Sequence, residues 1–579
     1  MCKLKKVISL LLISTFILSG TVLANENTIT SFNDVPANHW AYQAIHDLHA
    51  LEITDGIGNN NFGMGLTLKR SEFVTFLTKL MQWELINPGQ GSFIDNRDTT
   101  QWYYAYIETA LKHGVILNDS DRFRVDDPIT REEMAVMIVR ALAYDNLANQ
   151  LAYLGSPFND ILQNTGYITM AKDFGIINGV GNNLFQPHNT AKREEAAAMM
   201  MRMYEKLNRP INELHAFYAI SSVGQSSMIP TLDSVGFGWS RLEYDIDSNQ
   251  VVLNTTRNDD NEYGIPTGFS QPLMTAKENN ASTQLMVFAK NDIISNSSGS
   301  NVSLVEHIIT RPEIRKQVID SIVAQINKTT LDDVTVSFDG VVIDFEEMRG
   351  DLLKQSFNAF LAELKQELDK SNKLLYVAVH PERRPGQAYF DGYDYKTIGE
   401  IADKIILMAH DYYAKQLTDV EMQNGYTITP LSPIDEIYYA LKAITAVDTG
   451  VQDASKIWLQ FSYDSVQWKL KDGKIINRHP YNPSYEAIYQ RLAMDGVTLN
   501  YSSQYQNPYA TFYDERDGTN NIVWYEDARS TQAKIDLAKM FGIRGISLWR
   551  LGNIPNYEEQ PLKNAYLDAW QQIIGNLEK

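Results

Sequence analysis

Residues 338–347, Phe-Asp-Gly-Val-Val-Ile-Asp-Phe-Glu-Glu, constrain the fold of this chain more than any other stretch. Their apolar run is typical of a β-strand that is buried on both faces, as in parallel sheets covered by helices. Asp344 and Glu346 interrupt the run, and their spacing of two directs both carboxylates to one face near the strand's C-terminal end. Because two like charges there are costly unless they share a proton, the pair predicts a chemical role.

Apolar strands alternate with helices through the rest of the chain after residue 210. This alternation predicts an α/β fold, a (β/α)8 TIM barrel with insertions. We expect two polar segments rich in Tyr and Asn, at 245–280 and 465–520, to form loops over the active face. The expected strands lie at 216–221, 235–239, 284–288, 340–345, 374–380, 405–410, 457–461 and 545–549, and helices between them at 312–327, 352–368 and 531–541.

The C-terminal ends of the barrel strands form the active site in folds of this kind. Carboxylates and aromatic rings on one rim, with no cysteine and no histidine cluster, indicate sugar chemistry, so we predict no cofactor and no metal. A cation held by the three carboxylates is the alternative, but few other hard oxygen ligands accompany them. The residues expected on the rim are Asp344, Glu346, His380, His410, Asp411, Tyr412, Ser462, Tyr463 and Trp549.

A repeat of about sixty residues occupies the first third of the chain. Each copy begins with a Phe-x-Asp motif, at Phe32, Phe93 and Phe158, and continues with a helix, a polar turn and a second helix. In the second copy, Thr130 and Glu133 form a capping box at the start of that second helix. One unit is too small to bury a core alone, so we predict an all-α trimer of helix-loop-helix units.

The repeat resembles the S-layer homology (SLH) domain, with copies expected at 30–88, 90–150 and 155–207. The resemblance implies binding to secondary cell-wall polysaccharide on a Gram-positive-type envelope. It also implies that the helix-start arginines and two tryptophans line the glycan grooves, where an arginine fork suits an acidic sugar. The alternative for each arginine is a solvated charge at a helix end. The residues concerned are Trp40, Arg70, Trp102, Arg131 and Arg193.

Residues 1–24 have the features of a secretory signal peptide, with three lysines, an apolar core and a small-residue cleavage site. The single cysteine, Cys2, lies inside this segment. We therefore expect a secreted protein with no membrane insertion after cleavage. The net charge of −20 argues against nucleic acid as a partner, because nucleic-acid binding needs basic patches.

The expected barrel, at 212–579, resembles glycoside hydrolase family 18, the chitinase and endo-β-N-acetylglucosaminidase family. The Asp-Gly-x-x-x-Asp-x-Glu stretch at 339–346 is similar to the family's strand-four signature, and Met-Ala-His-Asp-Tyr at 408–412 is similar to its strand-six motif. Trp549 corresponds to the tryptophan beneath the sugar. Residues 523–527 are similar to the spore-cortex and cell-wall branch that acts on peptidoglycan.

The resemblance implies a retaining, substrate-assisted mechanism on a glycan that contains N-acetylglucosamine. Glu346 would protonate the glycosidic oxygen and later activate water, and Asp344 would hold the substrate's acetamido group while that group attacks the anomeric carbon. Asp411 would orient the sugar, and His410 would replace a tyrosine that bonds the acetamido oxygen. Further substrate contacts are expected from Trp549, Tyr412, Tyr463, Trp239 and Trp524.

Two positions depart from the family pattern. Val342 replaces an acidic or amide residue two before Asp344, so Asp344 should lean towards Glu346. His410 can donate the bond of the usual tyrosine, but with a different geometry and pH response. These departures leave an inactive glycan-binding protein, or a purely structural surface protein, as alternatives to a glycosidase. The choice between chitin and peptidoglycan also stays open.

Overall fold

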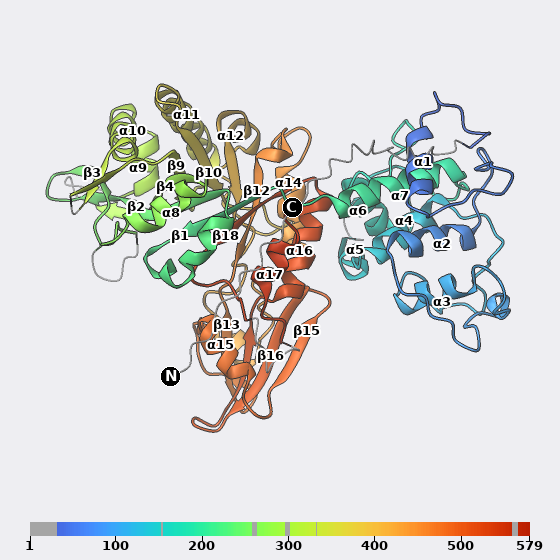
Figure 1. The fold of residues 1–579 in the computed structure, drawn as a ribbon. Helices are drawn as coiled ribbons and strands as arrows, with labels where there is room; N and C mark the ends of the chain where they lie inside the picture. The colour runs from blue at the N-terminus through green and yellow to red at the C-terminus, as the bar shows by residue number, and fades with distance from the viewer. Residues whose placement is uncertain are drawn as a thin grey trace, which may run out of the picture.

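The structure, a computed structural model, describes residues 32–151, 155–257, 263–295, 301–331, 333–557 and 565–578. It has a helical N-terminal domain, a barrel, and a small sheet domain inserted late in the barrel (Figure 1). The expected signal peptide at 1–24 lies outside the described residues. Within those ranges, we find no helix with the length and apolar character that a membrane crossing requires.

The N-terminal domain consists of short helices joined by long turns. The aspartate of each Phe-x-Asp motif accepts hydrogen bonds from backbone amides in the turn before the second helix of its own repeat; the Asp34 carboxylate accepts from Phe62, Gly63 and Met64 at 2.7–2.9 Å. Asp95 and Asp160 do the same in the other repeats. The helices are α1 (Tyr42–Ala50), α2 (Arg70–Leu80), η1 (Ile94–Asn96), α3 (Tyr104–Lys112), α4 (Arg131–Ala141), α5 (Asp145–Leu151), α6 (Thr165–Asp173) and α7 (Arg193–Asn208).

Three buried arginines join the repeats into a closed ring. The Nε atom of each donates at 2.9 Å to a phenylalanine carbonyl of another repeat, and each guanidinium lies over the ring of that same phenylalanine. Each also faces a glutamate of that repeat, at 2.5–3.6 Å. The first repeat thus binds the second, the second binds the third and the third binds the first, through Arg70 to Phe123 and Glu133, Arg131 to Phe185 and Glu195, and Arg193 to Phe62 and Glu72.

The second part is a closed barrel of eight parallel strands. All eight expected strands form in the expected order, and the pairing of β1 with β2 closes the ring, so the predicted TIM barrel is confirmed. β2 continues outward as a hairpin with β3 (Gln250–Asn254). The barrel strands are β1 (Glu213–Tyr218), β2 (Ser234–Asp245), β4 (Ser282–Lys290), β9 (Gly340–Glu346), β10 (Leu374–Val379), β11 (Lys404–Leu407), β12 (Ile457–Ser462) and β18 (Gly545–Trp549).

Helices cover the outside of the barrel, and apolar side chains fill most of its interior. Val342 points inward, as predicted, and packs in a cluster with Met286, Ile406 and Trp458. The remaining elements around the barrel are η2 (Ile220–Thr231), α8 (Ser270–Glu278), β5 (Ile293–Ser295), β6 (Asn301–Ser303), α9 (Leu304–Ile309), α10 (Pro312–Asn327), β7 (Thr329–Leu331), β8 (Val334–Val336), α11 (Gly350–Asp369), α12 (Tyr395–Ile401), α13 (Asp419–Gln423), α14 (Ile434–Ile444), η3 (Ala454–Lys456), α16 (Ala528–Met540) and α17 (Ala569–Gly575).

The third part of the structure, the inserted sheet domain, differs from the loops that we expected there. Most of the segment 465–520 forms a five-stranded antiparallel sheet with one helix, and 245–280 holds the β2–β3 hairpin and α8, where we expected loops. The sheet forms because alternate side chains, among them Trp468 and Ile522, bury one of its faces. Its elements are β13 (Val466–Lys471), β14 (Lys474–Ile475), α15 (Tyr485–Leu492), β15 (Thr498–Ser502), β16 (Asn507–Asp514) and β17 (Thr519–Trp524).

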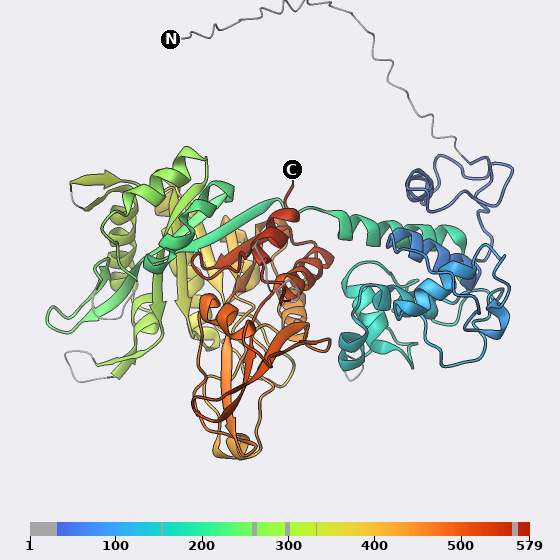
Figure 2. The same ribbon diagram turned by 60° about the horizontal axis from the view of Figure 1, so that its bottom comes forward.

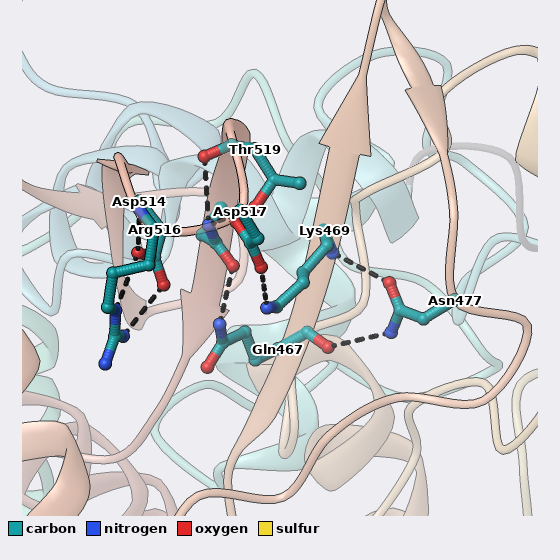
Figure 3. Close-up of polar contacts among 8 residues, drawn as sticks. Gln467, Lys469, Asn477, Asp514, Arg516, Asp517 and Thr519 are labelled. Atoms are coloured by element: carbon teal, nitrogen blue, oxygen red, sulfur yellow. Dashed lines mark hydrogen bonds and ion pairs between the residues drawn. The ribbon is translucent and has the colours of Figure 1, made fainter.

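Polar contacts tie the β16–β17 hairpin to β13 (Figure 3). The Gln467 amide donates to the Asn521 side chain at 2.6 Å, and Lys469 forms an ion pair with Asp517. In the turn itself, Arg516 bonds both carboxylate oxygens of Asp514, at 2.9 and 2.8 Å. These contacts occupy the charged groups of the hairpin with one another and indicate a structural role.

The third repeat is docked on the barrel. The C-terminal end of α6 meets α14 and the end of α16, and the C-terminal end of α7 contacts the end of α16 through Lys206, which donates to the Met540 carbonyl (Figures 1 and 2). The Asp173 carboxylate accepts from the Tyr438 hydroxyl and pairs with Lys442 at 2.7 Å. Phe174 is fully buried there, with its ring centre 5.5 Å from that of Phe541. The two domains therefore share one continuous apolar core.

Candidate active site

A pocket of about 400 Å³ opens at the C-terminal ends of β9, β10 and β11. The strand ends bring together side chains that are far apart in sequence, as the barrel topology predicts. Five of the residues predicted on the rim, Glu346, His380, His410, Asp411 and Tyr412, line it. The lining is Glu346, Glu347, Arg349, His380, Pro381, Arg383, Ala388, Tyr389, Phe390, Met408, His410, Asp411, Tyr412 and Lys415.

Asp344 and Glu346 lie on β9, Asp344 inside the barrel and Glu346 at its mouth. Asp344 is 5% exposed, and its Oδ1 atom has no hydrogen-bond partner. Burial, and then the charge of Glu346, raise the pKa of Asp344 well above its usual range. Burial also raises the pKa of Glu346 to about 7, with Glu347 adding to the shift and His410 opposing it. The pair therefore keeps a proton at neutral pH, as a general acid requires.

His410 and Asp411 follow β11 and form an ion pair, with Nδ1 of His410 3.1 Å from Oδ2 of Asp411. Burial by itself lowers the pKa of His410, but the Asp411 charge and the Gln460 contact reverse this, and the net shift is upward. Burial raises the pKa of Asp411, but His410 outweighs it and the net shift is downward. The two side chains thus hold each other in the charged form.

A chain of hydrogen bonds holds His410 from inside the barrel. Its Nε2 atom lies 2.7 Å from Oε1 of Gln460, the Gln460 amide donates to Ser547 at 3.2 Å, and the Ser547 hydroxyl lies 2.9 Å from Nδ1 of His215. Burial lowers the pKa of His215 to about 3, so that ring is neutral. Nε2 of His410 thus contacts Gln460, and Nδ1 lies beside the Asp411 carboxylate without a hydrogen bond to it.

Two predicted aromatic contacts lie at the barrel mouth. Trp549 ends β18 and packs on Phe217, with ring centres 5.2 Å apart. The ring of Tyr412 lines the pocket, beneath the Arg383 guanidinium at 4.7 Å. Trp549 is half-buried and does not line the pocket beside Glu346, so the two rings belong to different sides of the mouth.

Three other predicted substrate contacts are buried in cores. Trp239 has no exposed surface and packs on Phe237. Tyr463 lies against Tyr485, with its hydroxyl 3.3 Å from Thr531. Trp524 belongs to the core of the inserted sheet and donates its indole N–H to a backbone carbonyl. A buried ring cannot stack on a sugar, so these three residues are removed from the predicted site.

The predicted residues of the N-terminal domain divide into two groups. Trp40 and Trp102 are 62% and 56% exposed, as stacking on a glycan requires. The arginines Arg70, Arg131 and Arg193 are buried in the ring of contacts between repeats, which excludes solvated charges at helix ends. Arg70 also lines an open cavity of about 380 Å³ with other arginines from the second repeat.

Sequence reasoning missed the residues that surround and support the predicted acid. Arg349, Arg383 and Lys415 line the pocket, and each follows a predicted strand-end residue by three or four positions, which is a signal the sequence contains. Gln460 and His215 also carry a signal, as polar residues within apolar strands. Among the described residues, no set of three His, Cys, Asp or Glu side chains is grouped so as to hold a metal ion.

Comparisons with known proteins agree with both resemblances. The model of glycosyl hydrolases family 18 matches residues 217–553, and the S-layer homology domain matches 31–74, 97–135 and 157–197. The cortical fragment-lytic enzyme of Bacillus anthracis is 28% identical over 295 residues, 49% of this chain and 61% of that protein. Exoglucanase XynX of Acetivibrio thermocellus is 34% identical over 184 residues, 31% of this chain and 16% of that protein.

Among solved structures, the Bacillus cereus spore cortex-lytic enzyme SleL aligns with a TM-score of 0.47 and 21% identity, over 71% of this chain and 82% of that one. This chain spans less than two thirds of the length of the two curated relatives described above.

Proposed function

Because this chain belongs to glycosyl hydrolase family 18 and carries three SLH domains before its barrel, we propose that it is a cell-surface glycosidase. In this proposal the protein is secreted, its SLH domains bind the secondary polysaccharide of a Gram-positive-type cell wall, and its barrel cleaves β-1,4 bonds next to N-acetylglucosamine. The observation that carries the proposal is the carboxylate pair of β9, in which Glu346 has a pKa of about 7 and faces an open pocket.

We propose a substrate-assisted, retaining reaction. Glu346 donates its proton to the glycosidic oxygen as that bond breaks, while the carbonyl oxygen of the substrate's own acetamido group attacks the anomeric carbon. In this step the proton that the pair shares is on Glu346, so Asp344 is the carboxylate that accepts a hydrogen bond from the acetamido N–H and balances the positive charge that develops. Glu346, now a carboxylate, then takes a proton from the water that opens the intermediate. Asp411 orients the sugar, and His410 acts through Asp411 as a positioning residue.

The N-terminal domain supports a role as an anchor. The exposed rings of Trp40 and Trp102 are suited to stack on sugar faces, and an anchored enzyme meets the wall glycan at a high effective concentration. One relative is named a cortical fragment-lytic enzyme, which supports a cell-wall glycan as one candidate substrate beside chitin. Both substrates should therefore be tested together.

The test measures reducing ends that the full chain releases from purified peptidoglycan and from chitin oligomers. We compare the parent with Glu346→Gln, which removes the proton donor, and with Glu347→Gln, a neighbouring carboxylate that pairs with Lys290 at 3.4 Å. We expect Glu346→Gln to lose at least ~10³-fold in kcat and Glu347→Gln to retain activity. Equal release by the parent and Glu346→Gln would contradict the proposal.

A catalytically silent glycan-binding protein is the second candidate. The Oδ1 atom of Asp344 has no hydrogen-bond partner, and His410 has its Nε2 atom bonded to Gln460 and its Nδ1 atom beside Asp411, so the two positions that depart from the family pattern give a substrate less support. Retained binding of N-acetylglucosamine oligomers with no product from either substrate would favour this candidate.

A further inference from the structure

The pocket beside Glu346 is rich in basic groups, although the whole chain has a net charge of −20. Arg349, Arg383 and Lys415 line it together with His410. Acidic groups balance part of this charge: Glu436 pairs with Arg383, which leaves Arg349 and Lys415 as the basic lining groups without an ion pair among the described residues. Glu347 pairs with Lys290, Asp411 pairs with His410, and Glu346 holds a proton through most of the range below pH 7. The pocket therefore carries a positive charge that the proposed reaction does not use.

Arg383 is held in a fixed orientation. Its Nε and Nη2 atoms bond the two carboxylate oxygens of Glu436 at 3.0 and 3.2 Å, and its plane lies over the Tyr412 ring. Arg384 also pairs with Glu436, and with Asp435 at 3.1 Å. The two carboxylates therefore form ion pairs with the two neighbouring arginines. This arrangement fixes a guanidinium at the pocket wall before any ligand arrives, but Glu436 balances its charge and takes two of its N–H groups, so Arg383 offers a positioned donor rather than a free charge.

Arg349 and Lys415 have no carboxylate partner among the described residues. The Arg349 guanidinium lies 4.4 Å from the centre of the Phe390 ring and donates to the Tyr389 carbonyl. The Lys415 ammonium lies 3.5 Å from the centre of the Tyr413 ring. Aromatic rings and a carbonyl support these cations without forming an ion pair, although burial lowers the pKa of Lys415 and the charges of Asp411, Asp464 and Glu346 oppose that shift. Both positive charges are thus available to an acid that enters the pocket.

We infer that Arg349, Arg383 and Lys415 form a carboxylate-binding subsite beside Glu346. This inference rests on the proposed function and narrows it: the preferred substrate is an amino-sugar glycan that carries a carboxylate next to the bond that is cut. Chitin is neutral and has no carboxylate that could pair with these positive charges, whereas a guanidinium group binds a carboxylate through two parallel hydrogen bonds. The carboxylate can belong to the sugar itself, as in muramic acid, or to a peptide attached to it.

The experiment uses the full chain and matched substrates. Peptide-free glycan strands with a free sugar carboxylate are compared with the same strands after amidation, with peptide-bearing strands and with chitin oligomers. We expect kcat/KM to be about tenfold or more higher for the free acid than for the amide, because one charge-assisted contact is lost. The preference should fall as salt rises, through KM rather than kcat.

Variants identify the groups responsible. Arg349→Gln and Lys415→Met should each reduce the ratio of kcat/KM for the acid to kcat/KM for the amide about tenfold, and Arg349→Lys should retain most of that ratio. Lys370→Gln is the matched control, since it removes one positive charge at the far end of α11, outside the pocket. If cleavage is faster only when the sugar carboxylate is free, the subsite binds the sugar acid. If cleavage is faster only on peptide-bearing strands, the subsite binds a peptide carboxylate.

Equal kcat/KM for acid and amide, or equal losses on both substrates in Arg349→Gln, would overturn the inference. If no substrate is cleaved at all, the proposed function fails, but the subsite can still be judged. Calorimetry with the free-acid and amidated oligosaccharides then measures affinity directly. Tighter binding of the acid that is lost in Arg349→Gln supports the subsite, and equal affinity refutes it.

Discussion

Replacing Arg193 by methionine tests whether the ring of arginines holds the SLH domains together. Arg193 is 2% exposed, donates to the Phe62 carbonyl at 2.9 Å and bonds the Glu72 carboxylate at 2.6 Å. Its guanidinium also lies over Phe62, 5.1 Å from the ring centre. Methionine keeps the length of the aliphatic stem, so the substitution removes the polar contacts and leaves little empty space.

The expected loss follows from these contacts. The buried carbonyl of Phe62 without a donor costs about 1–3 kcal/mol, and the lost contact with the phenylalanine ring costs about 0.5–1 kcal/mol. Glu72 is partly exposed, so water can solvate its carboxylate after the arginine is removed. Loss of this ion pair therefore costs about 1 kcal/mol, less than the loss of a fully buried pair. We expect the free energy of opening of the repeat domain to fall by about 3–5 kcal/mol.

Hydrogen exchange read by mass spectrometry measures this locally, in peptides from residues 58–80. A loss of 3–5 kcal/mol corresponds to at least about a hundredfold faster exchange there, with barrel peptides as the internal reference. Lys69→Met is the matched control, because Lys69 bonds Asp126 at 2.7 Å on the surface, where such pairs contribute about 0–1 kcal/mol. Similar small changes in both variants would refute the reasoning. Loss of wall-polysaccharide binding with unchanged exchange would instead assign Arg193 to the ligand.

Three other changes have defined outcomes. Because the Glu346 pKa is about 7 and the acid acts when protonated, kcat/KM should decline as pH rises through about 7, and Glu347→Gln, which removes a repelling charge, should move that decline to lower pH in a pH–rate profile. A decline that Glu347→Gln leaves in place would contradict this assignment. Gln460→Leu removes the anchor of His410 and should lower kcat about tenfold or more with little change in KM, whereas Gln460→Glu, which keeps an acceptor, should retain more activity in the same steady-state assay. Phe174→Ala removes a fully buried ring between the domains and should increase the radius of gyration in small-angle X-ray scattering, while Leu162→Ala, at an exposed residue of the same repeat, should not.

Much of the barrel could be predicted from the sequence, because buried parallel strands are continuous apolar runs. The expected strand at 340–345 differs from the observed one by one residue, and Trp549 ends its strand as predicted. The inserted sheet was missed because its strands alternate apolar residues with Tyr, Asn and Thr, a pattern that also suits polar loops. The local sequence pattern alone does not distinguish such strands from polar loops.

The sequence predicts those site residues whose position follows from the end of their own strand. It predicts less well the residues whose burial depends on contacts with distant parts of the chain. Asp344, Glu346 and Asp411 lie where the strand ends predicted them. The burial of Trp239 and Trp524 depends on which face of a strand a helix or loop covers, which the spacing of residues does not reveal. The burial of Arg193 depends on its contact with Phe62, which is 131 positions away in the sequence. Arginines at helix starts, which resemble surface charges in the sequence, therefore connect one repeat to another.

The docking of the third repeat on the barrel has a geometric consequence for an enzyme that is fixed to a wall. A hydrolase on a flexible linker sweeps a volume and can attack any bond within the linker's length, but here α6 and α7 meet α14 and α16 through a buried core, with no free segment between them. The catalytic mouth is then held at one height and one angle relative to its attachment point. In the proposed function, such a protein would cut only those glycan strands that run past at that height, so the spacing of attachment points on the surface would limit how much of the wall is remodelled.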